Sequence, residues 1–234
     1  MWQEFQSVGQ KVVSSGLVES NFGNMSVLSG SGETFVITKT GVALDEIDKN
    51  GIIEVPLYPE KYKAEAGNMA VKKSATEKSA TEKSVAEKSA MEKSPAEKLA
   101  SSETPIHRMI YQKTNAKAIL HAHCPYSVVM SILETEIGNS SLIPIDSEGK
   151  LFLGEIPIVT GGIGSVELAK NAADAFCSGV NSHSNLNSNL SGIIICGHGT
   201  IAIGNTLKEA YRITTQLEYA SKIKYLYASA KNLF

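Results

Sequence analysis

Two histidines stand one residue apart at the end of an apolar run, in the segment ILHAHCPYS at 119–127. In a β-strand, residues i and i+2 point to the same face, so His121 and His123 would present their imidazoles side by side. An open site with three histidine ligands is typical of catalytic zinc. The pair therefore suggests a metal site if a third ligand comes from elsewhere, and structural or solvated histidines are the alternative interpretation.

His198 is the best candidate for that third ligand. It lies between Gly197 and Gly199 at the end of a second apolar run, and glycine allows close backbone approach and unusual dihedral angles. Cys124 and Cys196 are rival ligands. We interpret both as core thiols, because Cys124 should point away from the face of the two histidines and Cys196 ends an apolar run.

The remaining two histidines carry weaker signals. His107 falls beside Arg108 in a predicted helix, and we expect it near the surface or at the edge of the site. His183 lies in the polar segment NSHSNLNSN and is expected to be solvated.

Three short segments at 20–26, 38–41 and 101–103 are rich in Gly, Ser, Thr and Asn. Backbone N–H groups and hydroxyls of this kind suit a phosphate, although each segment alone fits a turn or a helix cap. Together they predict a phosphate pocket if the fold joins them. Glu103 closes the third segment, and beside a divalent cation a carboxylate can move protons at carbon. Alone it fits a charge in the first turn of a helix equally well.

The remaining pattern alternates helices with strands, which predicts one layered α/β domain with a sheet inside and helices outside. Ser102 is the expected cap of a helix that carries Pro105 in its first turn. Strands are expected at 34–38, 52–57, 117–123, 155–159, 192–196 and 200–204, and further helices at 2–13, from 125, at 165–177 and at 206–230.

Residues 73–97 form five copies of a five-residue unit, KSATE KSATE KSVAE KSAME KSPAE. A helix turns about 100° per residue, so this period presents no single apolar face. We predict a solvated, partly helical or disordered insertion at about 64–98 within one domain that spans 1–234. A partner-binding arm is the alternative.

Composition excludes several classes of protein. A net charge of −2 gives no general surface for nucleic acid or anionic membrane, and no apolar run reaches the length of a membrane span. The N-terminus lacks the apolar core of a signal peptide. Three widely spaced cysteines do not make a disulfide framework, which favours a reducing cytoplasm.

The order of these motifs resembles the class II aldolase/adducin family. GLVESNFGNMSV and TKTG look like its two phosphate loops, SSETPIH like its Ser-Ser-Glu motif, and HAH and GHG like its metal-binding segments. The resemblance spans nearly the whole chain apart from the repeat. It implies a mostly antiparallel central sheet flanked by helices, and a homotetramer with active sites at the subunit interfaces.

The resemblance also implies roles for individual residues. His121, His123 and His198 match the ligands of one Zn²⁺ per subunit, and Glu103 matches the catalytic acid/base, which can also occupy the metal when substrate is absent. The implied reaction is cleavage of a ketose 1-phosphate, with L-fuculose 1-phosphate as the expected substrate, to dihydroxyacetone phosphate and lactaldehyde. The matching phosphate contacts are Asn24, Thr40, Gly41, Ser101 and Ser102.

Two other functions fit the same motifs. One is an L-ribulose-5-phosphate 4-epimerase or another sugar-phosphate lyase of the family, and the other is a non-catalytic, adducin-like assembly domain. An assembly domain need not keep three histidines and the glutamate, so their presence favours an enzyme.

One family feature is missing from the sequence. The family aldolase carries a tyrosine after the HAH helix, where this chain reads IPIDSEGKLFLGEIP. Asp146 or Glu148 could take its role. Tyrosines of the last predicted helix could also reach a neighbouring site, although their spacing fits packing equally well: Tyr211, Tyr219, Tyr225 and Tyr227.

Overall fold

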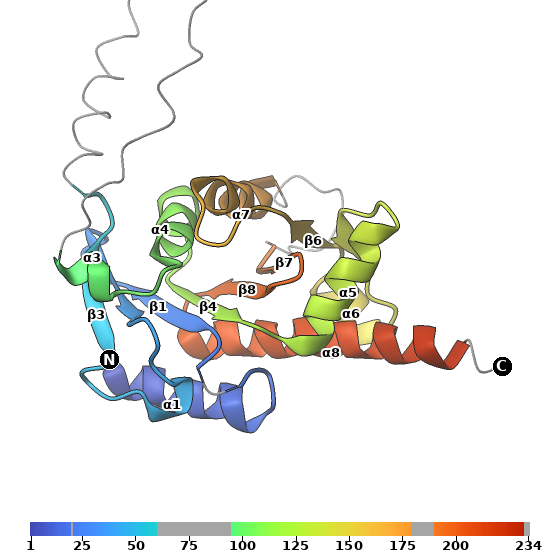
Figure 1. Cartoon of the computed structure of the whole chain (residues 1–234), viewed down its shortest axis with the longest axis horizontal. Coiled ribbons are helices and arrows are strands. Elements are labelled where there is room, and N and C mark those ends of the chain that lie inside the picture. The colour runs from blue at the N-terminus through green and yellow to red at the C-terminus, as the bar shows by residue number, and fades with distance from the viewer. Residues whose placement is uncertain (20, 60–94, 179–189, 232–234) are drawn as a thin grey trace, which may run out of the picture.

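The computed structural model describes residues 1–19, 21–59, 95–178 and 190–231. His183 and most of the predicted insertion lie outside this part of the chain. The described residues form an eight-stranded sheet in the order β3-β2-β1-β4-β8-β7-β6-β5 (Figure 1). Only β6 and β7 pair in parallel. The strands are β1 (Asn24–Leu28), β2 (Thr34–Thr38), β3 (Ile52–Pro56), β4 (Ala118–Ala122), β5 (Ser141–Leu142), β6 (Ile156–Val159), β7 (Gly192–Ile195) and β8 (Gly199–Gly204).

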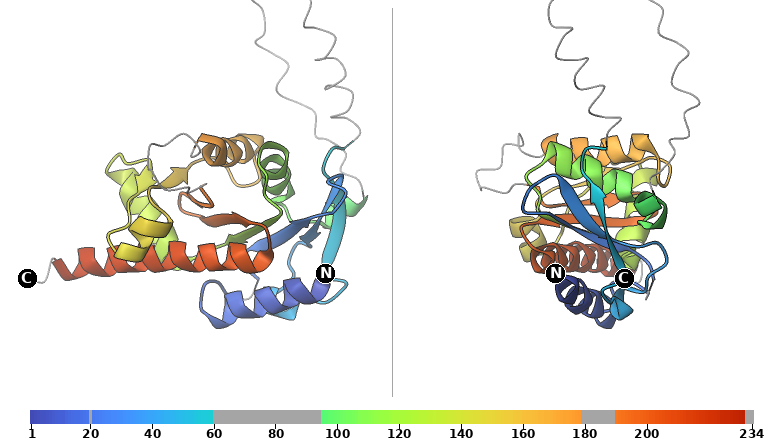
Figure 2. Two further views of the ribbon diagram at one scale, coloured as in Figure 1. Left: turned by 180° about the vertical axis from the view of Figure 1, so that it is seen from behind. Right: turned by 90° about the vertical axis from the view of Figure 1, so that its left-hand side faces the viewer.

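Helices cover both faces of this sheet (Figures 1 and 2). One face carries α4 (Thr104–Lys113) and α7 (Val166–Ser178), and the other carries α1 (Trp2–Ser14) and the long α8 (Leu207–Lys231). The shorter elements are η1 (Leu44–Glu46), α3 (Pro95–Leu99), α5 (Pro125–Glu136) and α6 (Ser147–Phe152). This architecture confirms the predicted α/β fold with a mostly antiparallel sheet flanked by helices.

Side chains along the central strands point alternately to the two faces of the sheet, which divides the interior into two cores. Leu120 of β4 belongs to the core that contains α1 and α8, whereas its neighbour Ile119 belongs to the core that contains α4 and α7. Successive side chains of a strand point to opposite faces, so His121 lies on the same face as Ile119, toward α4. The site residues on β4 are therefore placed on the α4 side of the sheet.

The N-terminal turn of α5 is fixed by a carboxylate from α8. Glu218 accepts hydrogen bonds from the backbone N–H groups of Tyr126 and Ser127, each at 2.9 Å, and from the Ser127 hydroxyl. These donors have no partner inside their own helix, so the buried carboxylate supplies one. Burial raises the pKa of Glu218. The contact holds the segment that directly follows the two histidines.

Most predicted elements occur at their expected places. The structure adds the short elements η1, β5 and α6, and two further differences concern α4 and β1. The helix at 104–113 begins after Glu103, which is its N-cap residue, so the prediction that Ser102 caps it is wrong. Residues 24–28 form a strand that the sequence did not indicate, because polar Asn24 and Ser26 interrupt its apolar pattern. Pro105 lies in the first turn of α4 as expected. Among the described helices, none combines the length and the apolar character that crossing a membrane requires.

Candidate metal centre and active site

The C-terminal end of β4, in the middle of the sheet, positions His121 and His123. His121 pairs with Asn24 of β1 on one side and with Ile201 of β8 on the other. His123 lies one residue beyond the strand and is partly buried, whereas His121 is fully buried. The strand therefore presents both imidazoles at one edge of the α4 face.

Two glycines explain how His198 reaches the same place. A Cβ atom on Gly199 would lie 2.4 Å from the carbonyl oxygen of Ala122 and 3.0 Å from the Cα atom of His123, so only glycine allows this approach of β8 to β4. Gly197 has φ +66°, a left-handed conformation that glycine adopts without steric cost. The Gly-His-Gly turn therefore folds His198 against the end of β4.

The three imidazoles form one cluster. Their ring centroids lie 4.8 Å apart for His121 and His123, 4.8 Å for His121 and His198, and 4.6 Å for His123 and His198. Their nitrogen atoms that could bind an ion all lie within 4.8 Å of one another. The structure thus brings together the three histidines that the sequence singled out.

The protonation states of His121 and His123 leave them able to bind a cation. Nδ1 of His121 lies 2.9 Å from the carbonyl oxygen of Thr200, which fixes Nδ1 as the donor and leaves the lone pair on Nε2. Burial, together with the neighbouring imidazoles, lowers the pKa of His121 to about 3 and that of His123 to about 4. Both rings are therefore neutral at physiological pH, as metal ligands must be.

Unpaired buried atoms provide a test of whether a metal fits. Nε2 of His121, Nδ1 of His198 and Oε1 of Glu103 are buried and have no hydrogen-bond partner among the described residues. Buried polar atoms normally have partners, and orphaned ones are costly. A cation bound by the imidazoles would satisfy the free lone pair on the Nε2 atom of His121, so the donor set fits a divalent metal. The assignment of the three histidines as its ligands stays a prediction.

Glu103 faces this cluster from the start of α4. Its Oε2 atom lies 3.1 Å from Nε2 of His121, and its Oε1 atom lies 3.4 Å from Nε2 of His198. The side-chain amide of Asn24 donates a hydrogen bond to Oε2 at 2.6 Å. Because Glu103 is only 4% exposed, its carboxylate is fixed by these contacts rather than by solvent.

The three polar segments meet beside Glu103. The backbone N–H of Ser101 in the third segment donates to the carbonyl oxygen of Thr38 in the second at 3.1 Å, and that of Thr40 donates to Leu99, just before the third segment, at 3.1 Å. The Thr40 hydroxyl also donates to the carbonyl oxygen of Ala100 at 2.8 Å. The first segment joins them through the bond from Asn24 to Glu103. Three of the predicted phosphate contacts are exposed: Thr40, Gly41 and Ser102.

A buried polar network behind Glu103 was not predicted. His107 is fully buried one turn further along α4, so of its two expected positions the one near the surface is wrong, and it packs at the edge of the site. Its Nδ1 atom lies 2.6 Å from the Ser26 hydroxyl, which lies 2.7 Å from the Tyr111 hydroxyl. Burial lowers the pKa of His107 to about 3. Asn24 and Ser26 lie two residues apart on β1 and therefore point to the same face. Through Glu103 and His107 they fix the start of α4 at two points.

The residues considered in place of the family tyrosine have other contacts. Asp146 caps α6, and its Oδ2 atom accepts a hydrogen bond from the Gly149 backbone at 2.8 Å. Tyr225 packs its ring against Tyr126 at a centroid distance of 5.4 Å. Tyr219 and Tyr227 are exposed. No contact between these residues and the cluster of histidines occurs within the described ranges.

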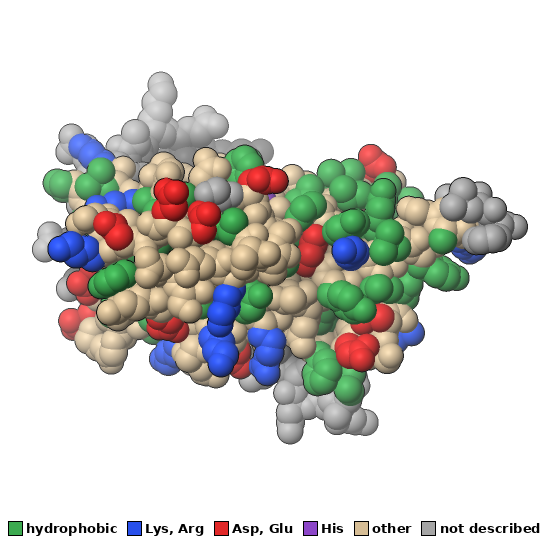
Figure 3. All heavy atoms as spheres, turned by 90° about the horizontal axis from the view of Figure 1, so that it is seen from below, with side chains coloured by type: hydrophobic (Ala, Val, Ile, Leu, Met, Phe, Trp, Pro, Cys, Tyr) green, Lys and Arg blue, Asp and Glu red, His purple; other side chains and the backbone are tan. Residues whose placement is uncertain are grey.

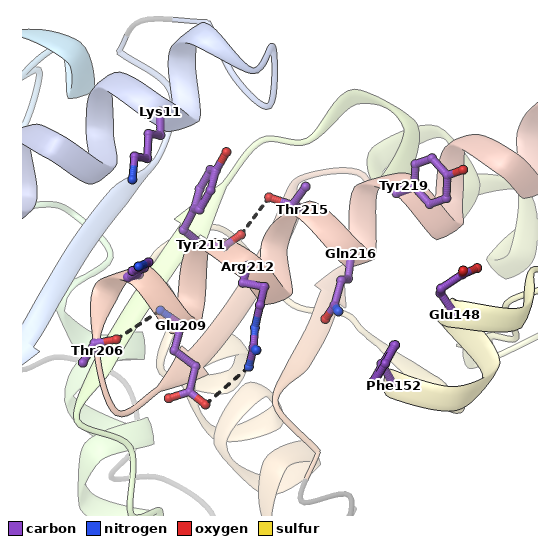
Figure 4. Close-up of a pocket in the computed structure, with 11 residues that line it drawn as sticks. Lys11, Glu148, Phe152, Thr206, Glu209, Tyr211, Arg212, Thr215, Gln216 and Tyr219 are labelled. Atoms are coloured by element: carbon purple, nitrogen blue, oxygen red, sulfur yellow. Dashed lines mark hydrogen bonds and ion pairs between the residues drawn. The ribbon is translucent and has the colours of Figure 1, made fainter.

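A large cavity in the described part of the molecule lies elsewhere. It is a groove of about 850 Å³ along the outer side of α8, between α1 and α6 (Figure 4). Tyr211, Arg212 and Tyr219 of α8 line it together with Lys11 and Phe152. The three histidines, Glu103 and the predicted phosphate contacts do not line it. The chemistry that the histidines indicate is therefore separate from this groove.

Known proteins resemble this chain over nearly its whole length. The family model of the class II aldolase and adducin N-terminal domain matches residues 3–225. The L-fuculose phosphate aldolase of Methanocaldococcus jannaschii is 26% identical over 226 residues, which cover 96% of this chain and 95% of that protein. The 5-deoxy-D-ribulose 1-phosphate aldolase of Bacillus thuringiensis is 22% identical over 228 residues, which cover 95% and 83%.

Solved structures give the same result. The crystal structure of L-fuculose-1-phosphate aldolase from Thermus thermophilus is similar with a TM-score of 0.68 and 26% identity, over 99% of this chain and 95% of that one. The fold, the family match and these relatives together show that the chain belongs to the class II aldolase and adducin family, as one of its aldolase-type enzymes.

Proposed function

We propose that this chain is a zinc-dependent aldolase that cleaves a ketose 1-phosphate, with L-fuculose 1-phosphate as substrate, to dihydroxyacetone phosphate and lactaldehyde. The observation that carries the proposal is the position of Glu103. Its carboxylate lies 3.1 Å from one imidazole nitrogen and 3.4 Å from another in a cluster of three histidines. An acid/base group beside an open three-histidine cluster suits proton transfer at a carbon next to a carbonyl.

His121, His123 and His198 would hold one Zn²⁺, and burial keeps the imidazoles of His121 and His123 neutral. When bound, zinc supplies a Lewis acid that polarises the substrate carbonyl and stabilises the negative charge that develops as the carbon–carbon bond breaks. Thr200 orients His121 by accepting the hydrogen bond from its Nδ1 atom. The rigid strands β4 and β8 carry these ligands, which keeps the site preorganised.

Glu103 would return the proton to the dihydroxyacetone phosphate carbon after cleavage, and would remove it in the reverse direction. Asn24 holds one carboxylate oxygen by a hydrogen bond of 2.6 Å. Because the carboxylate is buried, few competing water molecules reach it, so the proton moves between Glu103 and the substrate carbon. Asn24 and Glu103 thus act as one unit that spans β1 and α4.

The phosphate would bind beside this unit. In the segments at 38–41 and 101–103, the exposed Gly41 and Ser102 are the first candidate donors, and a phosphate suits such a cradle. Binding at the phosphate would orient the reacting carbon, so that binding energy far from the chemistry lowers the barrier. The proposed contacts are Asn24, Thr40, Gly41, Ser101 and Ser102.

We also propose that the site is completed by a second copy of the chain in a homotetramer. Exposed apolar side chains on α5 and at its C-cap support this proposal: Val129, Ile132, Leu133 and Ile137. Ile132 approaches Gly197, beside the third histidine, to 3.8 Å from the position of a Cβ atom. Figure 3, which views the side of α1 and α8, shows further hydrophobic side chains gathered toward the end of the molecule where α8 ends.

Two further assignments are proposals. We propose one domain across 1–234 with a repeat insertion at about 64–98, and a reducing, cytoplasmic setting. Cys124, Cys177 and Cys196 support the second point, since none of them forms a disulfide.

The test is synthesis in the reverse direction. Zinc-loaded protein is incubated with dihydroxyacetone phosphate and either lactaldehyde or acetaldehyde, and the products are identified by mass and stereochemistry. Lactaldehyde gives a six-carbon ketose 1-phosphate, and acetaldehyde gives the five-carbon product whose aldolase name the Bacillus relative carries. We expect the six-carbon product, and a chelator should abolish its formation.

Other outcomes would correct the proposal in a defined way. Preference for acetaldehyde would change the substrate to 5-deoxyribulose 1-phosphate and keep the chemistry. No product from either aldehyde, with bound zinc demonstrated, would contradict the aldolase and make L-ribulose 5-phosphate epimerisation the next assay.

A further inference from the structure

Phe22 covers one face of the His123 imidazole. The two ring centroids lie 5.5 Å apart and the ring planes differ by only 9°, so the rings are stacked. Phe22 comes from the segment between α1 and β1, about a hundred residues earlier in the chain. It is 48% exposed, so its ring lies at the surface rather than in either core.

The backbone beside Phe22 is fixed against β4. Gly23 has φ +116°, and a Cβ atom there would lie 2.5 Å from the carbonyl oxygen of His121. The backbone N–H of Phe22 also donates to the carbonyl oxygen of Glu19 at 3.0 Å. The position of the Phe22 ring is therefore set by close backbone packing on the strand that carries the histidines.

The three histidines of the cluster are held in different ways. His121 is fully buried, and its Nδ1 atom bonds to the carbonyl oxygen of Thr200. The backbone N–H of His198 donates to Ile195 in a tight turn between two glycines. The ring nitrogens of His123 have no hydrogen-bond partner within the ranges that the structure covers. Its ring contacts are the other two imidazoles and Phe22.

A metal-binding histidine normally has an outer partner that fixes its ring, most often a hydrogen-bond acceptor. We infer that Phe22 replaces such a partner for His123 and is a positioning residue of the metal centre. This inference rests on the proposed role of His123 as a ligand. The stack restricts rotation of the imidazole about its side-chain bonds, so less conformational freedom is lost when a cation binds.

Stacking also favours the metal-bound form. A coordinated imidazole shares the positive charge of the ion, and the face of a phenyl ring attracts positive charge. An aromatic pair contributes free energy beyond that of the area it buries. If the stack favours the metal-bound form by this amount, the metal affinity rises by roughly three- to tenfold. Phe22 should therefore change how tightly the metal binds without contacting the metal.

The test measures metal binding without substrate. Phe22→Ala removes the ring, Phe22→Leu keeps apolar bulk without a ring, and Phe22→Tyr keeps the stack and directs its hydroxyl to the exposed edge. Zn²⁺ affinity is measured by competition with a chelating indicator, and visible absorption of the Co²⁺ form reports coordination geometry. Thermal unfolding of the metal-free proteins checks that the half-exposed position leaves the fold intact.

We expect Phe22→Ala and Phe22→Leu to bind Zn²⁺ roughly three to ten times more weakly and to alter the Co²⁺ spectrum. Phe22→Tyr should match the wild type in both. Wild-type affinity in the Leu or the Ala variant would overturn the inference, and so would a Tyr variant as weak as the Ala variant. A wild-type protein that binds zinc but cleaves no ketose 1-phosphate would instead contradict the proposed function and leave the Phe22 result standing.

Discussion

At the scale of single residues, the candidate centre depends on three clustered imidazoles that face a buried carboxylate. The four described histidines differ in their contacts. His121, His123 and His198 share one cluster, whereas His107 bonds to Ser26 behind the carboxylate. Metal binding should therefore distinguish the first three from the fourth.

His123→Ala should lose metal, because two imidazoles replace three as ligands. Loss of a residue that only hydrogen-bonds to a metal ligand typically lowers metal affinity by roughly 10- to 100-fold. Because this variant loses a ligand itself, we expect its affinity for Zn²⁺ to fall further. The variant should stay folded, since His123 is only partly buried. His107→Gln is the matched control and should keep one Zn²⁺ per chain, measured by elemental analysis after gel filtration. Full zinc content in the alanine variant would contradict the ligand assignment.

At the scale of elements, the centre depends on how closely β1 and β8 approach the end of β4. Glycine makes both approaches possible, Gly23 on one side and Gly199 on the other. The two strands carry different parts of the site, because Asn24 of β1 holds Glu103 and the turn before β8 carries His198.

Gly199→Ala should force β8 away from β4, since its Cβ atom would lie 2.4 Å from the carbonyl oxygen of Ala122. We expect a loss of about 1–3 kcal/mol in the free energy of unfolding and weaker metal binding. Gly30→Ala is the control, because a Cβ atom there would meet no heavy atom within 4 Å. Urea unfolding measures both variants. Equal stability of the two would show that the close approach is not required.

The sequence predicted the strands that follow simple apolar patterns, such as 34–38 and 117–123. It did not indicate β1, because Asn24 and Ser26 bond to α4 inside the protein and look like turn residues in the sequence. Motif spacing was enough to single out Glu103 and the three histidines. The contacts of Thr200 and Phe22 depend on strand register and on a stack between distant segments, which local patterns do not contain.

At the scale of the whole molecule, buried neutral histidines link stability to pH. The folded-state pKa of His107 is about 3, below the ordinary value of 6.5. Between these values the unfolded chain binds a proton that the folded chain excludes, so stability falls as the pH falls from about 6.5. His121 and His123 act in the same direction in the metal-free protein.

His107→Gln should reduce this pH dependence. The wild type should lose roughly 1 kcal/mol more than the variant in unfolding free energy between pH 7 and pH 5.5. Urea unfolding of both proteins at the two pH values, with a chelator present, measures the difference. Parallel losses in the two proteins would show that His107 is not excluded from protonation in the folded state.

The most direct test of the central claim is proton exchange at dihydroxyacetone phosphate without any aldehyde. Zinc-loaded wild-type protein and Glu103→Gln are incubated with the compound in heavy water. Deuterium at the hydroxymethyl carbon, on the side of the carbonyl without the phosphate, is followed by NMR. We predict stereospecific incorporation of one deuterium by the wild type. Glu103→Gln should incorporate none while keeping its zinc. Exchange at the wild-type rate in the glutamine variant, or no exchange in zinc-loaded wild type, would contradict the assignment of Glu103 as the group that moves the proton.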